Sequence, residues 1–207
     1  MTLTPASPFD PSTPLTVAFA GWTDLSAPLT YSVYIDDIII GVQGTSASRN
    51  FTGPATPGSH TLKGRIHDSF NNVTEVTQSF VVNTPQQSWR QLHFGTTASS
   101  GNTADLADFD GDGIVNLVEF AFGLNPTSGS SIQLPQGQVT GGNFVISFAT
   151  PSGVSGVTYG AEWSTTLSSN PADWTTIPDT GAGGAHTFSV PVGSNQRMFV
   201  RLKVTSP

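Results

Sequence analysis

Short stretches of alternating apolar and polar residues dominate the first part of the chain, and a period of two predicts half-buried β-strands. Between positions 14 and 22, for example, Leu15, Val17 and Phe19 alternate with small or polar residues. Stretches rich in Gly, Pro, Asn and Asp separate further segments of this kind, which are residues 29–35, 38–42, 60–68 and 73–83. About six or seven short strands at this spacing predict an antiparallel β-sandwich over residues 9–84.

The last third of the chain returns to the same alternation and predicts a second small sandwich over residues 131–207. In residues 198–204, Phe199, Arg201 and Lys203 fall on one face. Further alternating segments are residues 143–150, 157–167, 174–178 and 186–192. Residues 1–8 are expected to form an N-terminal arm that either extends a neighbour's sheet or stays disordered.

Between the two β-regions, residues 85–130 change to a helical pattern. Residues 88–95 predict a short helix with Ser88 as its N-cap and Gly95 at its end. Residues 116–123 predict a second short helix. The expected fold is therefore mainly β, with two small antiparallel β-sandwich domains joined by a short helical segment.

Composition narrows the classes of function. The 207 residues carry a net charge of −7 with a pI near 4.7, which argues against nucleic acid or an anionic membrane as a partner. No run of apolar residues is long enough for a membrane-spanning helix, so no membrane insertion is expected. The absence of cysteine excludes disulfides and thiolate metal sites. The N-terminal residues lack the basic and apolar regions of a signal peptide.

One stretch concentrates acidic residues in a chain of which only 10% is charged: DFDGDGIVNLVE, residues 108–119. It matches the calcium-loop pattern D-x-[DN]-x-[DN]-G-x₅-E at every specified position. The residues expected to supply ligands are Asp108, Asp110, Asp112, Ile114, Asn116 and Glu119. The sequence therefore predicts a Ca²⁺ site here, with a solvated acidic turn as the alternative.

The spacing has a physical reason. Ca²⁺ takes about six to eight oxygen ligands, and alternate carboxylates in a tightly wound loop can point to one centre. Gly113 allows the sharp turn, and Ile114 offers its carbonyl oxygen. Asn116 binds directly or through water, and Glu119 closes the site with both oxygens. Mg²⁺ prefers a smaller octahedral cage, and transition metals prefer His or Cys, which the loop lacks.

The loop resembles an EF-hand-like or dockerin-like calcium loop, present once. Its surroundings, W-R-x₃-F-G followed by ADLADFDGDGIVNLVEFAFGLNP, resemble a segment of large modular proteins secreted by bacteria. In those proteins a C-terminal β-module follows, and the positions that match it are Val157, Tyr159, Glu162, Trp163, Ser164, Leu167, Trp174, Phe199, Arg201 and Leu202. Residues 9–84 resemble Ig-like, PKD-like or fibronectin-like surface modules. The resemblance implies a bacterial extracellular or cell-surface location.

No nucleophile elbow, zinc-protease motif or phosphate loop occurs, and the acids outside the calcium loop are scattered. The chain is therefore expected not to be an enzyme. A carbohydrate-binding accessory module of a secreted hydrolase is the alternative, and its candidate stacking residues are Trp22, Trp89, Trp163 and Trp174. An isopeptide crosslink through Lys63 or Lys203 also stays open.

These observations predict an extracellular structural or adhesive module. Ca²⁺ would rigidify the junction between two β-domains, because metal binding would supply folding energy to the acidic segment. The expected partners are neighbouring domains or identical subunits of an extracellular assembly, such as a filament or surface layer, and a glycan is a further possibility.

Overall fold

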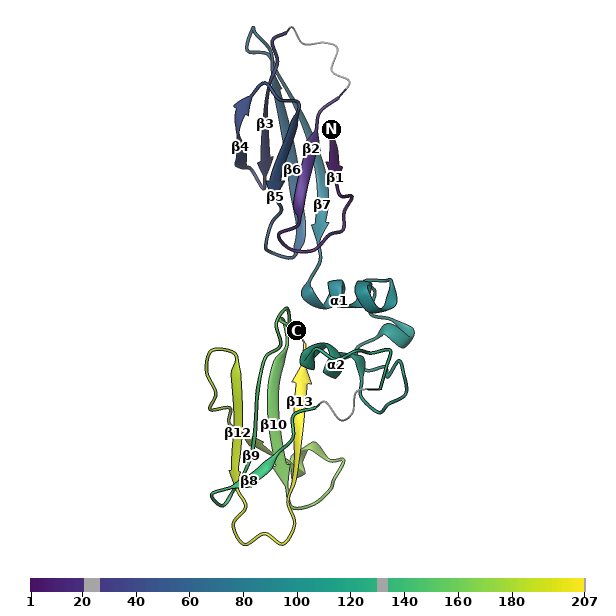
Figure 1. The fold of residues 1–207 in the computed structure, drawn as a ribbon, viewed down its shortest axis with the longest axis vertical. Helices are drawn as coiled ribbons and strands as arrows, with labels where there is room; N and C mark the ends of the chain where they lie inside the picture. The colour runs from purple at the N-terminus through teal and green to yellow at the C-terminus, as the bar shows by residue number, and fades with distance from the viewer. Residues whose placement is uncertain (21–26, 130–133, 207) are drawn as a thin grey trace. The chain divides into compact units, whose positions relative to one another are not determined.

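The structure is a computed structural model that describes residues 1–20, 27–129 and 134–206 (Figure 1). Strands make up 42% of the chain and helices 12%, and every pair of named strands is antiparallel, which confirms the expected mainly β fold. The chain divides into two compact units, Met1–Ser88 and Trp89–Pro207.

The first unit contains two sheets. One has the strand order β1-β2-β5, and the other β4-β3-β6-β7. The strands of this unit are β1 (Thr2–Thr4), β2 (Pro14–Ala18), β3 (Thr30–Ile35), β4 (Ile38–Gly44), β5 (Ser48–Thr52), β6 (Gly58–His67) and β7 (Val73–Val82). The two residues between β3 and β4, Asp36 and Asp37, both have positive φ, as a two-residue hairpin of type I′ requires.

Alternate residues of both sheets fill one buried core. Leu15 and Val17 of β2 belong to the same cluster as Val33 of β3 and Leu62 and Ile66 of β6. All five are 1% exposed or less, so the alternation in the sequence identified the inward faces of these strands.

The N-terminal residues are part of the first unit in the structure. The sequence set residues 1–8 apart as an arm, whereas Thr2–Thr4 pair with β2, and Met1 and Leu3 pack against the core. Gly64 of β6 permits this approach, because a Cβ atom there would lie 2.7 Å from the Met1 sulfur. Two apolar residues spaced by one are enough for a short edge strand, but too few to stand out as a pattern.

The second unit also contains two sheets, with the orders β11-β10-β13 and β12-β9-β8. Its strands are β8 (Gln138–Thr140), β9 (Asn143–Ala149), β10 (Thr158–Ser164), β11 (Thr175–Ile177), β12 (Ala185–Pro191) and β13 (Phe199–Thr205). Tyr159 and Ala161 of β10 share a core with Phe188 and Val190 of β12 and with Ala121. Ala121 lies on helix α2 (Asn116–Phe122), so this helix is part of the packing of the second unit.

Helix α1 (Pro85–Phe94) begins earlier than the sequence predicted. Thr84, not Ser88, caps it: the Gln87 N–H donates to the Thr84 hydroxyl, and the Gln87 amide oxygen accepts from the Thr84 N–H. This is a capping box with Pro at the first helical position. Ser88 lies inside the helix and donates to the Thr84 carbonyl oxygen and to the Asp10 carboxylate.

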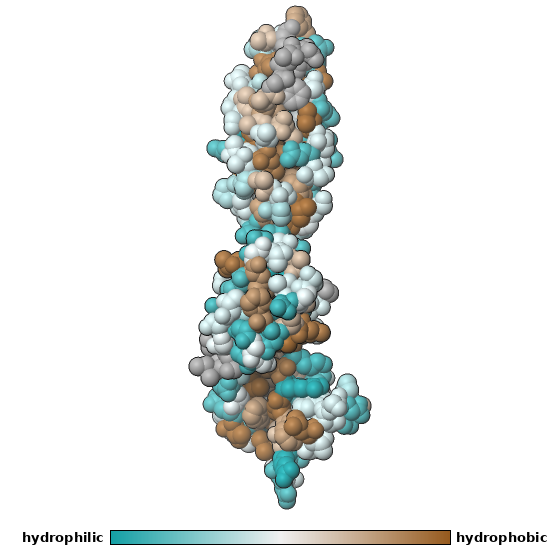
Figure 2. All heavy atoms as spheres, turned by 90° about the vertical axis from the view of Figure 1, so that its right-hand side faces the viewer, coloured by the Kyte–Doolittle hydropathy of each residue, from teal (hydrophilic) through white to brown (hydrophobic). Residues whose placement is uncertain are grey.

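Two short 3₁₀ turns complete the described elements, η1 (Gly101–Thr103) and η3 (Pro171–Asp173). Helix α2 ends at Phe122, and Gly123 caps it with a φ of 64°, a left-handed conformation that glycine adopts without strain. None of the described helices is long and apolar enough to cross a membrane. On the face drawn in Figure 2, apolar and polar residues are interspersed.

Candidate metal site

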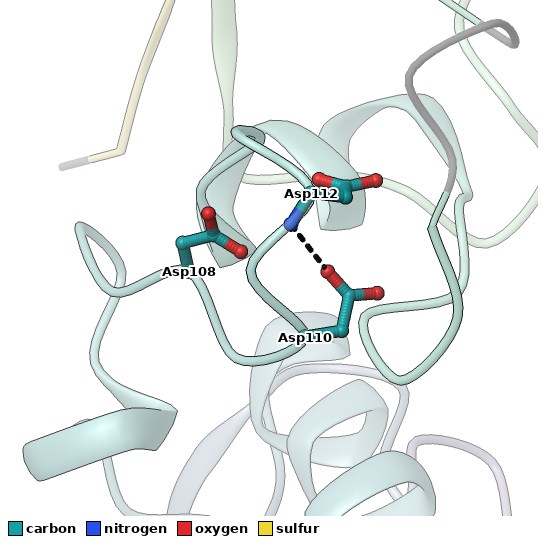
Figure 3. A group of neighbouring side chains, drawn as sticks. All are labelled: Asp108, Asp110 and Asp112. Carbon is teal, nitrogen blue, oxygen red and sulfur yellow. Dashed lines mark hydrogen bonds between the residues drawn. The ribbon is translucent and has the colours of Figure 1, made fainter.

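The acidic loop lies between η1 and α2, within the second unit. Carboxylate oxygens of Asp108, Asp110 and Asp112, one from each, lie within 4.8 Å of one another (Figure 3). The three side chains come from alternate positions of one tight loop, as Figure 3 shows. The spacing of the acids in the sequence thus brings them together in the structure.

Hydrogen bonds from backbone N–H groups to these carboxylates fix the shape of the loop. Asp108 accepts from the N–H groups of Gly111 and Gly113, at 2.8 and 2.9 Å. Asp110 accepts from the N–H of Asp112 at 3.2 Å, and Asp112 from that of Ile114 at 2.8 Å. Gly111 and Gly113 have φ values of 78° and 93°, which a residue with a Cβ adopts only with strain. The loop is therefore shaped by its own acids and glycines.

Glu119, the fourth acid of the predicted loop, is not among the carboxylates whose oxygens lie within 4.8 Å of one another. It lies in α2 and is 0% exposed, and neither of its carboxylate oxygens has a hydrogen-bond partner among the described residues. Burial raises the pKa of this carboxyl to about 7, and the negative charges of Asp110, Asp112 and Asp108 contribute further. A carboxyl that is buried, has no described hydrogen-bond partner and feels the negative charge of three acids is costly to ionise without a cation.

Two more buried oxygens of the loop lack a described hydrogen-bond partner. Asp110 Oδ2 and Asn116 Oδ1 are buried and have no hydrogen-bond partner among the described residues. No ion pair of the described part of the chain involves Asp108, Asp110 or Glu119. Buried polar atoms are almost always paired, and these oxygens all belong to residues of the predicted calcium loop, so they fit a cation that takes oxygen ligands.

Ile114 and Asn116 occupy the remaining predicted positions. The Ile114 side chain is 6% exposed and belongs to the interior. Asn116 is 1% exposed, and its Nδ2 donates to the carbonyl oxygens of Asn102 and Ala104, at 2.9 and 2.8 Å. The donor set of the site consists of oxygens alone, which suits a hard divalent cation such as Ca²⁺ better than a transition metal.

The loop is anchored to α1 by an ion pair that the sequence did not single out. Arg90, which is 5% exposed, donates to Asp105, and Asp105 also accepts from the Ser99 hydroxyl at 3.2 Å. The backbone carbonyl of Asp105 accepts from Leu117 of α2 at 3.0 Å. Nothing in the sequence pointed to this pair, because Arg90 and Asp105 are 15 residues apart and are joined by the packing of α1 on the loop.

Aromatic rings add to this anchorage. The Trp89 ring of α1 lies 5.7 Å from that of Phe120 in α2, and the Phe94 ring lies 4.8 Å from that of Phe109 in the acidic loop. Such pairs are worth about 1 kcal/mol each beyond the area they bury. Helix α1, the loop and α2 therefore pack as one cluster.

The described tryptophans have their rings engaged. Trp89 packs on Phe120, and Trp163 packs against the core of the second unit. Arg201 lies over the Trp174 ring at 4.0 Å, and the indole N–H of Trp174 donates to Ser168. Trp22 lies outside the described residues.

The two lysines named for a crosslink form ion pairs instead. Lys63 pairs with Asp37, whose side chain is 79% exposed. Lys203 lies 2.6 Å from Glu162. Asp37 is exposed, and Glu162 is shared between Lys203 and Arg201, so neither contact is a lysine and a carboxylate paired alone in a buried site.

A comparison of the chain with protein-family models and with curated proteins found no match.

Proposed function

We propose that this chain is a structural module that binds one Ca²⁺ in the loop of residues 108–119, and that the ion holds the segment around it folded. The observation that carries the proposal is Glu119, a fully buried carboxylate without a described partner beside three acids. A cation at this point would pair with the carboxylate and offset the mutual repulsion of the acids. Metal binding would then contribute directly to the free energy of folding.

The ligand roles follow the calcium-loop pattern. Asp108, Asp110 and Asp112 would supply carboxylate oxygens, Ile114 its carbonyl, and Glu119 both of its oxygens from the first turn of α2. Asn116 completes the set with its buried oxygen. A calcium-dependent module of this kind suits the extracellular or cell-surface location that the resemblance implies.

The same ion would stiffen the connection between two Ig-like β-domains. Helix α1 starts with residues of the first unit and ends with residues that pack on the acidic loop. If the loop unfolds without Ca²⁺, the contacts of Arg90 and Phe94 with it are lost and the connecting helix is free to move. A module of this kind suits an adhesin, a surface layer or a filament, with neighbouring domains or identical subunits as partners.

Calorimetric melting in excess EDTA and in millimolar Ca²⁺ tests the proposal. We expect Ca²⁺ to raise the melting temperature of the second unit by several degrees, since ligand binding to the folded state stabilises it by mass action. Asp110→Ala and Glu119→Ala are expected to abolish the rise. Asp173→Ala is the matched control, because it removes an exposed acid of the same unit and should leave the rise intact. A wild-type protein that melts identically in both buffers would refute calcium binding.

A further inference from the structure

Asn116 makes hydrogen bonds that a simple ligand role does not require. Its Nδ2 bridges the carbonyl oxygens of Asn102 and Ala104, and its backbone N–H donates to the carbonyl oxygen of Ala107 at 2.8 Å. The next residue, Leu117, donates its N–H to Asp105 at 3.0 Å. The first two residues of α2 thus donate hydrogen bonds to four backbone carbonyl groups of the segment that precedes the acidic loop.

The orientation of the amide is fixed by chemistry. Both neighbours of Nδ2 are carbonyl oxygens, which only accept, so the nitrogen must face them and Oδ1 must point the other way. Asn116 is 1% exposed, so water cannot readily replace these bonds. The nitrogen is therefore committed to the backbone, and only the oxygen is available to an ion or to a water bound to one.

The segment held in this way stands where a regular EF-hand has its incoming helix. Residues 101–103 form a single 3₁₀ turn, and no longer helix lies between α1 and the loop in the structure. Local hydrogen bonds shape this turn, among them those of Thr103 with Ser100 and Ala98, but they do not connect it to α2. Ala107, whose carbonyl Asn116 binds, directly precedes the first predicted ligand, Asp108.

We infer that Asn116 is a positioning residue of the Ca²⁺ site: its Nδ2 clamps the incoming turn onto α2 and so presents Asp108 to the ion, and this contributes more to binding than its own oxygen does. The inference rests on the proposed function for the identity of the ion. The clamp itself consists of hydrogen bonds within the protein, so it acts with or without metal.

Two substitutions separate the clamp from a ligand role. Asn116→Asp keeps an oxygen at the position of Oδ1 but sets a second oxygen against two carbonyl groups. Asn116→Ser keeps a neutral oxygen and loses the bridge. Asn102→Asp is the control, since Asn102 is exposed, contributes its backbone carbonyl to the clamp, and gains the same charge in the same segment. The measurements are Ca²⁺ titration calorimetry and melting of each variant in EDTA.

We expect both Asn116 variants to bind Ca²⁺ about 10- to 100-fold more weakly than the wild type, the usual effect of removing a group that orients a ligand. Both should also melt at lower temperature in EDTA, while Asn102→Asp stays close to the wild type in both measurements. Equal or tighter Ca²⁺ binding by Asn116→Asp would overturn the inference, because it would show that the oxygen is what matters.

The EDTA measurement keeps this inference distinct from the proposed function. If the wild type bound no Ca²⁺, the proposed function would fail, and a lowered melting temperature of the Asn116 variants would still establish the clamp. If the Asn116 variants melted like the wild type in EDTA, the clamp would be refuted whatever the affinity for Ca²⁺.

Discussion

At the scale of single residues, Glu119 is the group whose charge decides the behaviour of the site. Its carboxyl is fully buried and its pKa is raised to about 7, first by burial and then by the three aspartates. In the unfolded chain the same carboxyl titrates near its ordinary value of 4.5. Between these two values the metal-free folded protein binds a proton that the unfolded chain has lost, so its stability falls as the pH rises.

We therefore expect Glu119→Gln to stabilise the second unit in EDTA, with a gain that is absent below pH 4.5 and grows until about pH 7. The gain should reach at most roughly 3 kcal/mol, from the difference between the two pKa values. Urea unfolding at several pH values measures it. In Ca²⁺ the order should reverse, because the variant loses a ligand charge. A difference that stays constant with pH would contradict the burial of this carboxylate without metal.

At the scale of elements, the pairing of β10 with β13 explains several positions of the C-terminal pattern. Glu162 of β10 lies opposite Arg201 of β13 and accepts hydrogen bonds from Arg201 and from Lys203. Arg201 in turn covers Trp174. The Glu162 side chain is only 13% exposed, so this is a cross-strand cluster with one shielded acid.

Glu162→Gln should lower the stability of the second unit by about 1 kcal/mol near neutral pH. Hydrogen bonds from Lys203 and Arg201 hold the pKa of Glu162 below its ordinary value of 4.5. The contribution is therefore complete above pH 4.5 and is lost as the pH falls through the lowered pKa. Urea unfolding at pH 7 and in acid checks this. Glu75→Gln is the control, since the Glu75–Arg65 pair is more exposed and should matter less; an equal loss in both variants would contradict the role of shielding.

The strands and helices differ in how well they could be predicted from the sequence. Strands with three alternating apolar residues, such as Phe144, Ile146 and Phe148 of β9, could be predicted, because each residue of the series repeats the signal. Strand β5 could not, since Phe51 is its only large apolar residue and its neighbours are polar. The predicted N-cap of α1, Ser88, was wrong by four residues, because Thr84 forms a capping box with Gln87.

Some features of the candidate site could likewise be predicted from the sequence, and others could not. The grouping of Asp108, Asp110 and Asp112 could be predicted from their spacing, since a loop of this length brings alternate residues together, whereas Glu119 lies outside the group. Arg90 and the clamp of Asn116 could not, because their partners are set by the packing of α1 and η1. Contacts between backbone carbonyls and a distant side chain leave no mark in the sequence.

At the scale of the whole molecule, the chain joins two β-rich units through a helix whose second half packs on the acidic loop. Each unit has its own core, with separate clusters of buried residues. The acidic loop belongs to the second unit but supplies none of the residues of its core cluster, so it is the part of that unit whose order most needs an additional source of free energy. Ca²⁺ would supply it.

The burial of Arg90 has a consequence for the lifetime of the chain. Arg90 is the only Lys or Arg between Arg65 and Arg197, and in the structure it is 5% exposed within α1. Trypsin cuts after basic residues in unfolded segments, so we expect rapid cleavage after Arg90 in EDTA, giving residues 1–90 and 91–207, and slow cleavage in Ca²⁺. Asp110→Ala should be cut at the same rate in both buffers. If the wild type were cut after Arg90 at the same slow rate with and without Ca²⁺, α1 would stay docked without metal. If Ca²⁺ slowed the cleavage, Arg90 would be a site at which calcium controls proteolysis of the chain.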